Sequence, residues 1–461
     1  DEQYTYTNYP FVFCKWGDAC IGFAGISLAE QLKNIQMEIN KLALRIQQSM
    51  HLMSVPWLFV QHGSRVVESR LRNSPGTIVN YVGEKPSSYV PTAMHPEVLQ
   101  EMMPFLSEQQ GNPTSNHKFG RRAQTAIEEA REKVAFSVNA HPSQVIFTAS
   151  GTESNNTIIN GIAQSYPETH FAYSAIEHPC ISEPIKSLSR KGFMATKILV
   201  NKQGLLDLED VKIDIKNPIS FLSVMMANNE TGVIQDLPKI IKWAKLKKMI
   251  VHTDAVQALG KIPVDFEMLE VDAMTISSHK IYGPQGVAAL ILNKKIDMSP
   301  FIIGGGQEKG LRSGTENIAA IIGFGKACER TKENMVIIDR DIKPLQVILI
   351  KELKKMGAII FGEDSERLNN TIFFAFNRID GATLLTALDR KGFALASGSA
   401  CSSNNNEPSH VLIEMGVNEE IAQGAIRISL GINSKKTDVE TFLVALKSEL
   451  ERLKQLTAIA A

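Results

Sequence analysis

Short apolar runs alternate with helical patterns over most of the chain beyond residue 92. Each run is five or six residues long and is apolar at most positions, which is typical of strands that are buried on both faces. Helical patterns of about three to five turns lie between several of the runs, as in units that join parallel strands through a helix. The pattern therefore predicts an α/β fold in which a mostly parallel sheet is covered by helices on both faces. The predicted strands span residues 144–149, 171–175, 219–224, 249–253, 273–277 and 287–292.

The pattern changes near residue 335. Beyond this point, long helical patterns over residues 339–356 and 436–457 flank shorter apolar runs over residues 370–376 and 425–430. Long helices around a few short strands are typical of a smaller α+β domain. We therefore predict two domains in this part of the chain, a large one over residues 89–335 and a small C-terminal one over residues 336–461.

The first 88 residues follow a different pattern. Ser27 and Glu30 form a capping box, and apolar residues then follow at alternating steps of four and three. This spacing predicts a helix over residues 27–52 with a narrow apolar seam, and residues 57–60 and 77–82 are predicted strands. We therefore expect an extra N-terminal α+β segment. The seam residues are Leu28, Leu32, Ile35, Ile39, Leu42 and Ile46.

Composition narrows the class of protein. The chain has 461 residues and 49 lysines and arginines against 49 aspartates and glutamates, so no net charge favours nucleic acid or an anionic membrane as a partner. No apolar run reaches the length of a membrane span, and the five cysteines have neither disulfide-framework nor zinc-ligand spacing. We therefore expect a protein of a reducing compartment, the cytoplasm. The cysteines are Cys14, Cys20, Cys180, Cys328 and Cys401.

Three motifs place chemically useful groups at predicted strand ends. Residues 150–156 (SGTESNN) combine a glycine with small hydroxyl side chains, and such a turn into a helix exposes backbone N–H groups to a phosphate. Asp254, with Gln257 one helical turn later, ends a second strand, where open α/β sheets place their ligands. Lys280 follows a third strand, where an amine can form a Schiff base with an aldehyde cofactor.

Each of these motifs has a simpler interpretation when it stands alone. The first is also an ordinary helix cap, Asp254 is also typical of a turn, and Lys280 is also typical of a solvated surface charge. Together they supply a phosphate seat, a carboxylate and a lysine, which are the parts that hold pyridoxal phosphate. The carboxylate keeps the ring nitrogen protonated and the lysine binds the aldehyde. We therefore predict pyridoxal 5′-phosphate as the cofactor.

Further motifs extend this constellation in a fixed order along the chain. They span residues 111–117, 152–156, 177–178, 228–232, 252–257, 277–280, 304–306, 312–315, 397–401 and 427–431. On these motifs, residues 92 to about 456 resemble a cysteine desulfurase of the aminotransferase class V group. The resemblance implies a pyridoxal-phosphate-dependent transferase fold of type I, a homodimer, and the conversion of L-cysteine to L-alanine with transfer of the sulfur to the enzyme.

The resemblance also implies a role for each site residue. Lys280 would bind the cofactor and remove the substrate α-proton, and His178 would stack on the ring. Cys401 would be the nucleophile that becomes a persulfide. Its small, polar neighbours favour it over Cys180, which we expect at the start of a packed helix. The cofactor would also be held by Gly151, Thr152, Asn229, Asp254, Gln257, Ser277 and His279, with Thr315 from the partner subunit, and the substrate carboxylate by Arg427 and Asn229.

The start of the resemblance departs from the family pattern. Family members usually begin with a strand, an aspartate and an Ala-Thr-Thr step that lines the substrate pocket, whereas residues 88–96 here match only from Thr92. Residues 25–86 weakly resemble an internal piece of a tailed-phage portal protein, and a helical extension for dimer or partner contacts is the other interpretation. Selenocysteine lyase and an inactive fusion with an assembly segment stay open as alternative functions. The expected partners are L-cysteine and a sulfur acceptor such as an iron–sulfur scaffold, with no nucleic acid and no membrane.

Overall fold

The computed structural model describes residues 94–109, 111–208, 220–398 and 408–460, and the backbone of two strands in the first part of the chain. The chain forms two compact units, Asp1–Pro91 and Thr92–Ala461. In the first unit, β1 (Leu58–Gln61) and β2 (Ile78–Tyr81) pair in parallel, which confirms both predicted strands. The helix predicted over residues 27–52 lies outside the described residues.

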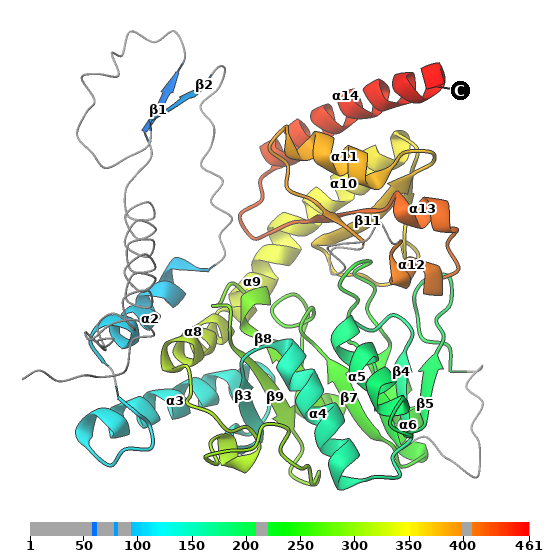
Figure 1. The fold of residues 1–461 in the computed structure, drawn as a ribbon. Helices are drawn as coiled ribbons and strands as arrows, with labels where there is room; N and C mark the ends of the chain where they lie inside the picture. Colours follow the sequence, from blue (N-terminus) through cyan, green and yellow to red (C-terminus); the bar gives the residue numbers. More distant parts are fainter. Residues whose placement is uncertain are drawn as a thin grey trace, which may run out of the picture. The chain divides into compact units, whose positions relative to one another are not determined.

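The second unit contains a seven-stranded sheet with the order β3-β9-β8-β7-β6-β4-β5 (Figure 1). Strand β9 runs antiparallel to β3 and β8, and the other neighbouring strands are parallel. All six strands predicted for this region are present. The edge strand β5 escaped prediction because its alternating, partly exposed residues lack the continuous apolar run of the others. The strands are β3 (Val145–Thr148), β4 (Phe171–Ser174), β5 (Ala195–Ile198), β6 (Phe221–Ser223), β7 (Ile250–Asp254), β8 (Ala273–Ser277) and β9 (Ala288–Leu292).

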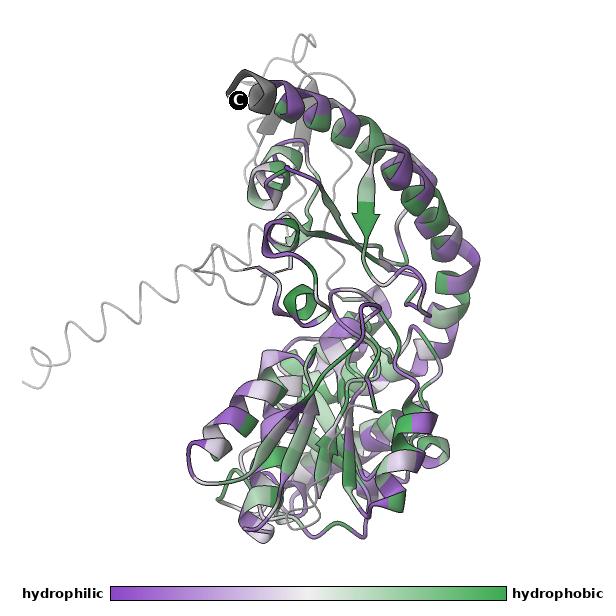
Figure 2. Cartoon of the chain, turned by 90° about the vertical axis from the view of Figure 1, so that its right-hand side faces the viewer, coloured by the Kyte–Doolittle hydropathy of each residue, from purple (hydrophilic) through white to green (hydrophobic). Residues whose placement is uncertain are grey.

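Helices cover both faces of this sheet because consecutive strand residues point to opposite sides and are apolar on both. In β9, Ala289 and Ile291 belong to one buried cluster and Leu290 and Leu292 to the other. Figure 2 shows the apolar strands lying between helices whose outer sides are polar. One face is covered by α2 (Pro96–Ser107), α3 (Lys118–Ser137), α6 (Leu237–Leu246) and α8 (Ile318–Glu329), and the other by α4 (Gly151–Ser165) and α5 (Pro179–Ser189).

A run of helices leads to a second, antiparallel sheet. Its strand order is β10-β11-β13-β12. The run consists of α9 (Thr331–Ile337), a π-helical turn (Ile338–Ile342) and α10 (Lys343–Lys355). The domain boundary proposed near residue 335 lies within α9, where the helices lead from one sheet to the other (Figure 1). The remaining elements are β10 (Ala358–Ile360), β11 (Thr371–Phe376), α11 (Gly381–Asp389), β12 (Ala396–Ser397), α12 (His410–Glu414), α13 (Glu419–Gln423), β13 (Ile426–Ser429) and α14 (Lys436–Ala460), with the short α7 (Phe266–Leu269) in the large sheet region.

A buried ion pair fixes the loop before α8 against the large sheet. Arg131 on α3 donates from its two Nη atoms to the two carboxylate oxygens of Glu308, at 2.8 and 2.9 Å. The backbone N–H of Phe147 on β3 donates to Glu308 Oε2 at 2.8 Å, and Arg131 also donates to the Val145 carbonyl. Both charged side chains are almost fully buried. The loop that contains Thr315 is therefore anchored at its start.

We expect Arg131→Met to lower the free energy of unfolding by about 3–5 kcal/mol, because Glu308 is left as a buried charge without its cation. Urea denaturation measures this loss. The matched control is Lys186→Met, which breaks an exposed ion pair with Glu183 and is expected to cost less than about 1 kcal/mol. Equal losses in the two variants would contradict the structural role of the buried pair.

Within the described ranges, no helix combines the length and the apolar composition of a bilayer span. The same part of the chain contains no cluster of histidine, cysteine, aspartate and glutamate that could hold a metal ion.

Candidate active site

The site is organised around Asp254, the last residue of β7. Its carboxylate is buried and accepts two hydrogen bonds, from the Val256 backbone N–H at 2.9 Å and from Asn155 Nδ2 at 2.8 Å. Burial raises the pKa of Asp254, although these bonds and the nearby His178 act in the opposite direction. A cation that approached the carboxylate would offset this burial. Asp254 is therefore suited to bind a protonated ring nitrogen.

His178 lies beside this carboxylate at the start of α5. Its Nδ1 accepts a hydrogen bond from the Cys180 backbone N–H at 3.1 Å, and the Cys180 thiol lies 2.9 Å from the same nitrogen. The neutral ring therefore has its proton on Nε2. Burial lowers the pKa of His178 against the pull of Asp254, so the neutral form is favoured. Burial also raises the pKa of Cys180 to about 12, which keeps that thiol protonated and makes it a poor nucleophile.

Lys280 ends a short 3-10 turn that follows β8 directly. Because β7 and β8 are parallel neighbours with Asp254 in register with Thr275, the sheet brings Lys280 to the same edge as Asp254. The positive charge of Lys280 lowers the pKa of both His178 and His279, after the larger effect of burial. The lysine, the imidazole and the carboxylate therefore form one electrostatic cluster.

The predicted phosphate seat lies where α4 begins. Ser150 caps the helix by accepting from the Glu153 N–H at 3.1 Å, and the N–H groups of the first turn have no partner within the helix. Gly151 packs closely on the strand-end residues, since an added Cβ would lie 3.2 Å from Val256 Cγ2 and 3.9 Å from Ser277 Cβ. Thr152 is exposed at this helix start. Gly151, Thr152 and Ser277 are thus gathered at one place.

Ser277 and His279 contact each other at the same edge. Ser277 Oγ lies 2.9 Å from His279 Nδ1, and the serine is buried whereas the histidine is exposed. A hydroxyl and an imidazole beside a helix N-terminus are suitable donors to a phosphate. Their role as phosphate ligands stays a prediction, which this position allows.

Arg427 reaches the site from β13 of the smaller sheet. Its Nη1 donates to the carbonyl oxygen of Asn229 at 2.7 Å, which fixes the guanidinium against the segment after β6. Arg427 Nε and Asn229 Oδ1 are buried and have no hydrogen-bond partner among the described residues. Unpartnered buried groups of this kind cost free energy unless a ligand pairs with them. Arg427 Nε–H can therefore donate to an anionic ligand group such as a carboxylate, whereas Asn229 Oδ1 can accept from a ligand donor.

Gln257 is fixed by a lysine that the sequence analysis did not single out. Lys261 Nζ donates to Gln257 Oε1 at 2.7 Å, which leaves the amide NH₂ of Gln257 to face away from the ammonium. Burial lowers the pKa of Lys261 to about 7, with further contributions from Lys280 and Arg427. Gln257, Lys261, Lys280 and Arg427 therefore belong to one neighbourhood.

Thr315 is not gathered with the other predicted site residues, and the position of Cys401 is not described. Thr315 is exposed on the loop before α8, and Arg312 in the same loop pairs with Glu153 of α4 at 2.7 Å. Cys401 lies outside the described residues, between Gly398 and Pro408. The roles predicted for Thr315 and Cys401 therefore stay predictions.

The site can now be compared with known proteins. Residues 88–442 match the family model of class-V aminotransferases. The chain belongs to the class V aminotransferase family. A cysteine desulfurase IscS of Dictyoglomus turgidum is 42% identical over 373 residues, which cover 79% of this chain and 94% of that protein.

Solved structures agree with this assignment. A NifS-like protein from Rickettsia africae superposes with a TM-score of 0.69 at 36% identity, over 78% of this chain and 96% of that one. SspA, solved in complex with cysteine, superposes with a TM-score of 0.66 at 30% identity, over 74% of this chain and 97% of that one. The chain therefore belongs with the cysteine desulfurases of this family, which are pyridoxal-phosphate-dependent. This assignment confirms the predicted fold class and the predicted cofactor.

The described residues fit this cofactor of the family. Three groups lie at one edge of the sheet. The buried carboxylate suits the ring nitrogen of the cofactor, the lysine suits its aldehyde, and the helix N-terminus with its adjacent hydroxyls suits its phosphate. Asn229 Oδ1 and Arg427 Nε add buried polar groups that no atom in the described part of the chain satisfies. We propose that the cofactor is held by the residues that the sequence analysis named, with Asn155 as an additional support.

Asn155 escaped prediction, although it lies within a recognised motif. It is fully buried on α4, and its amide donates both to Asp254 Oδ2 and to Cys180 Sγ. Its role depends on the contact of α4 with the end of β7, which a motif of adjacent residues does not reveal. Asn155 therefore orients the carboxylate without needing to touch the ring.

We expect Asn155→Ala to weaken pyridoxal phosphate binding about 10- to 100-fold, because a supporting hydrogen bond to a ligating carboxylate is lost. Equilibrium titration of the apoenzyme with the cofactor measures the change. The control is Asn160→Ala on the same helix, whose amide bonds to the Asn156 carbonyl and which should bind the cofactor normally. An affinity equal to wild type in Asn155→Ala would contradict the proposed support.

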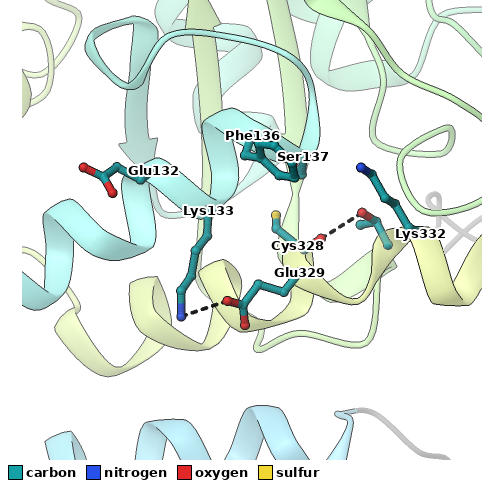
Figure 3. A pocket seen from close by; sticks show the side chains of 8 residues that line it. Glu132, Lys133, Phe136, Ser137, Cys328, Glu329 and Lys332 are labelled. Atoms are coloured by element: carbon teal, nitrogen blue, oxygen red, sulfur yellow. Dashed lines mark hydrogen bonds and ion pairs between the residues drawn. The ribbon is translucent and has the colours of Figure 1, made fainter.

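A separate cavity of about 350 Å³ lies between α3 and the α8–α9 region (Figure 3). It is lined by Phe136, Cys328 and the ion pair of Lys133 with Glu329 at 3.2 Å. Burial raises the pKa of Cys328 to about 12, so the thiol stays protonated. These groups do not form an arrangement of nucleophile and base, and we assign no chemistry to the cavity.

Proposed function

We propose that the protein converts L-cysteine to L-alanine and retains the sulfur as a persulfide on Cys401. The observation that supports this most strongly is the buried Asp254 carboxylate on β7 next to β8, the strand that leads directly to Lys280. Bound pyridoxal phosphate supplies an electron-accepting ring that makes the α-proton of the attached amino acid acidic. The residues of the chain then bind, orient and move protons around that ring.

The substrate carboxylate would bind to Arg427. The carbonyl of Asn229 already holds one Nη atom, so the remaining N–H groups, including the unpartnered Nε–H, face a carboxylate with a fixed orientation. Asn229 would contribute its side-chain amide next to the same group. This pairing would align the amino acid so that its α-proton faces Lys280 Nζ.

Proton transfer would involve Lys280 and His178. Lys280 Nζ would remove the α-proton and return a proton as alanine forms. His178, neutral and with its proton on Nε2, would lie against the ring face and can hold a proton during the reaction. Ser277, His279, Gly151 and Thr152 would bind the phosphate.

Sulfur transfer would take place at Cys401. The thiolate of Cys401 would attack the sulfur of L-cysteine, forming an S–S bond as the C–S bond breaks. The electron pair of the C–S bond remains on the substrate carbon, which takes up a proton. One L-cysteine and one enzyme thiol thus give one L-alanine and one enzyme persulfide, so atoms and electrons balance.

The direct test is incubation of the purified holoenzyme with L-cysteine and dithiothreitol. We expect alanine and sulfide in equal amounts, measured by amino acid analysis and a sulfide assay. L-serine, which lacks the sulfur, should give neither product. If the holoenzyme forms no alanine from L-cysteine, the proposal fails. A much faster turnover of L-selenocysteine would instead assign the protein as a selenocysteine lyase.

We also propose a homodimer that acts in the cytoplasm and passes sulfur to an acceptor protein such as an iron–sulfur scaffold. The exposed position of Thr315 is compatible with a contact to the cofactor phosphate of the partner subunit. Sedimentation of the holoenzyme tests the dimer. Transfer of radiolabelled sulfur to a purified scaffold tests the acceptor.

A further inference from the structure

Glu230 is a buried acidic residue for which the proposed mechanism has no role. It follows Asn229 directly in the segment after β6, and 5% of its surface is exposed. Its backbone N–H donates to Asn228 Oδ1 at 2.9 Å, so the residue is fixed at its backbone as well as at its side chain. Buried carboxylates are rare unless the structure gives them a partner.

The partners of Glu230 are the two flanks of the segment 399–407. Ser409 Oγ donates to Glu230 Oε2, and the same oxygen of Ser409 accepts the Leu412 N–H as the cap of α12. On the other flank, a Cβ built on Gly398 would lie 3.3 Å from Glu230 Oε2 and 2.6 Å from Ser409 Cβ. One carboxylate oxygen thus lies against both ends of the segment that contains Cys401.

Glu230 also adjoins the residue that holds Arg427, the proposed clamp for the substrate carboxylate. Arg427 Nη1 donates at 2.7 Å to the carbonyl of Asn229, the peptide group that joins Asn229 to Glu230. Strand β12, which leads into Gly398, pairs with β13 so that Ala396 lies opposite Arg427. Arg427 therefore contacts the peptide group whose nitrogen belongs to Glu230.

We propose that Glu230 is a positioning residue that ties both flanks of the Cys401 segment to the Arg427 clamp. The inference rests on the proposed function, because it assigns to the segment and to the clamp the roles given above. Its negative charge holds Ser409 through a charge-assisted hydrogen bond and also reduces the positive potential at Arg427. Glu230 thus lowers the affinity for the substrate carboxylate somewhat, while it holds Gly398 and Ser409, the residues that flank the segment containing Cys401.

The ionisation of Glu230 is consistent with such a role. Burial raises the pKa of Glu230 to about 7, while Ser409 and Arg427 act to lower it. The ionised form, which holds Ser409 more strongly, therefore becomes populated as the pH rises through neutrality. The other ionisable groups around the adjoining cavity are Tyr173 on β4, Glu183 and Lys186 on α5, Lys197 on β5, and His410 and Glu414 on α12.

The test compares Glu230→Gln with wild type in two measurements on the holoenzyme. The first is the affinity for L-alanine, followed by the change in cofactor absorption, which reports the carboxylate clamp without sulfur transfer. The second is the single-turnover rate of alanine formation from L-cysteine. We expect L-alanine to bind about threefold more tightly because Arg427 regains its full charge, and the single-turnover rate to fall about tenfold. A purely structural defect would weaken binding rather than strengthen it.

Matched variants separate the two effects. Ser409→Ala removes the hydrogen bond that helps to lower the pKa of Glu230, so it is measured at about pH 9, where Glu230 remains ionised. There we expect a slower single turnover with unchanged L-alanine affinity. Asn418→Ala removes the cap of α13, where Asn418 accepts from the Glu420 N–H, and should change neither quantity. The rise of the wild-type single-turnover rate between about pH 6 and pH 8 should be smaller in Glu230→Gln.

Weaker or unchanged L-alanine binding in Glu230→Gln, or a single-turnover rate equal to wild type, overturns the inference. If Glu230→Gln does not fold, the outcome of Ser409→Ala decides, since an unchanged rate in that variant also overturns it. Failure of the wild-type enzyme to form alanine from L-cysteine is a failure of the proposed function instead, and the L-alanine titration still tests the charge effect.

Discussion

Lys280→Ala will abolish the absorption band of lysine-bound pyridoxal phosphate and will lower the rate of alanine formation from L-cysteine by about 10³- to 10⁴-fold. The amine is both the covalent attachment point and the group proposed to move the α-proton, and the register of β7 with β8 brings its strand end next to Asp254. Absorption spectroscopy of the holoenzyme and single-turnover alanine formation measure the two effects.

Lys295→Ala is the matched control for this experiment. Lys295 is exposed beyond the end of β9, so this variant should keep both the band and the rate. Cofactor stoichiometry should be recorded in both variants, since phosphate and ring contacts remain in Lys280→Ala. Persistence of the band in Lys280→Ala would mean that another lysine binds the aldehyde, and the assignment of the site would have to change.

Cys401→Ser will lower the formation of alanine and sulfide from L-cysteine by about 10³-fold or more, because a hydroxyl is a far weaker nucleophile toward sulfur than a thiolate. The cofactor band should remain, since the residues proposed to hold the ring are unchanged. Mass spectrometry of the wild-type protein after a single turnover should show one added sulfur, located on the peptide that contains Cys401.

Cys328→Ala provides the control because Cys328 is a buried thiol whose pKa is raised to about 12 by burial. It should retain the added sulfur and the rate of wild type. If Cys401→Ser still accumulates a persulfide, the nucleophile is another cysteine. Cys180, which contacts His178 and Asn155 near the cofactor site, would then be the next to test despite its protonated state.

Much of the fold was predictable from the sequence because buried parallel strands are apolar at nearly every position. Six of the seven strands of the large sheet, and the strands of residues 371–376 and 426–429, match predicted runs to within one residue at the carboxyl end of β7. The edge strands β5, β10 and β12 were not predicted, because two to four residues with partly exposed side chains leave no distinct pattern. They become strands by pairing with neighbours that are distant in sequence.

In the candidate site, too, some residues were predictable from the sequence and others were not. Asp254, Lys280 and the helix start after Ser150 were predictable because strand ends and helix starts place their neighbours at one sheet edge. Asn155, Lys261 and Glu230 were missed because each acts through a contact between elements far apart in sequence. Glu230 is the clearest example, since its partner Ser409 lies 179 positions away.

The division of the second unit into two sheets also predicts where backbone amides exchange most slowly with solvent. Asp254 and Ser277 end strands in the middle of a seven-stranded sheet, whereas Arg427 belongs to a separate four-stranded sheet. Backbone amides of central strands exchange with solvent mainly through global unfolding, while smaller units open at lower free energy. The residues proposed to hold the cofactor ring and the residue proposed to hold the substrate therefore lie in different sheets, and we expect slower amide exchange at the ends of β7 and β8 than in β13.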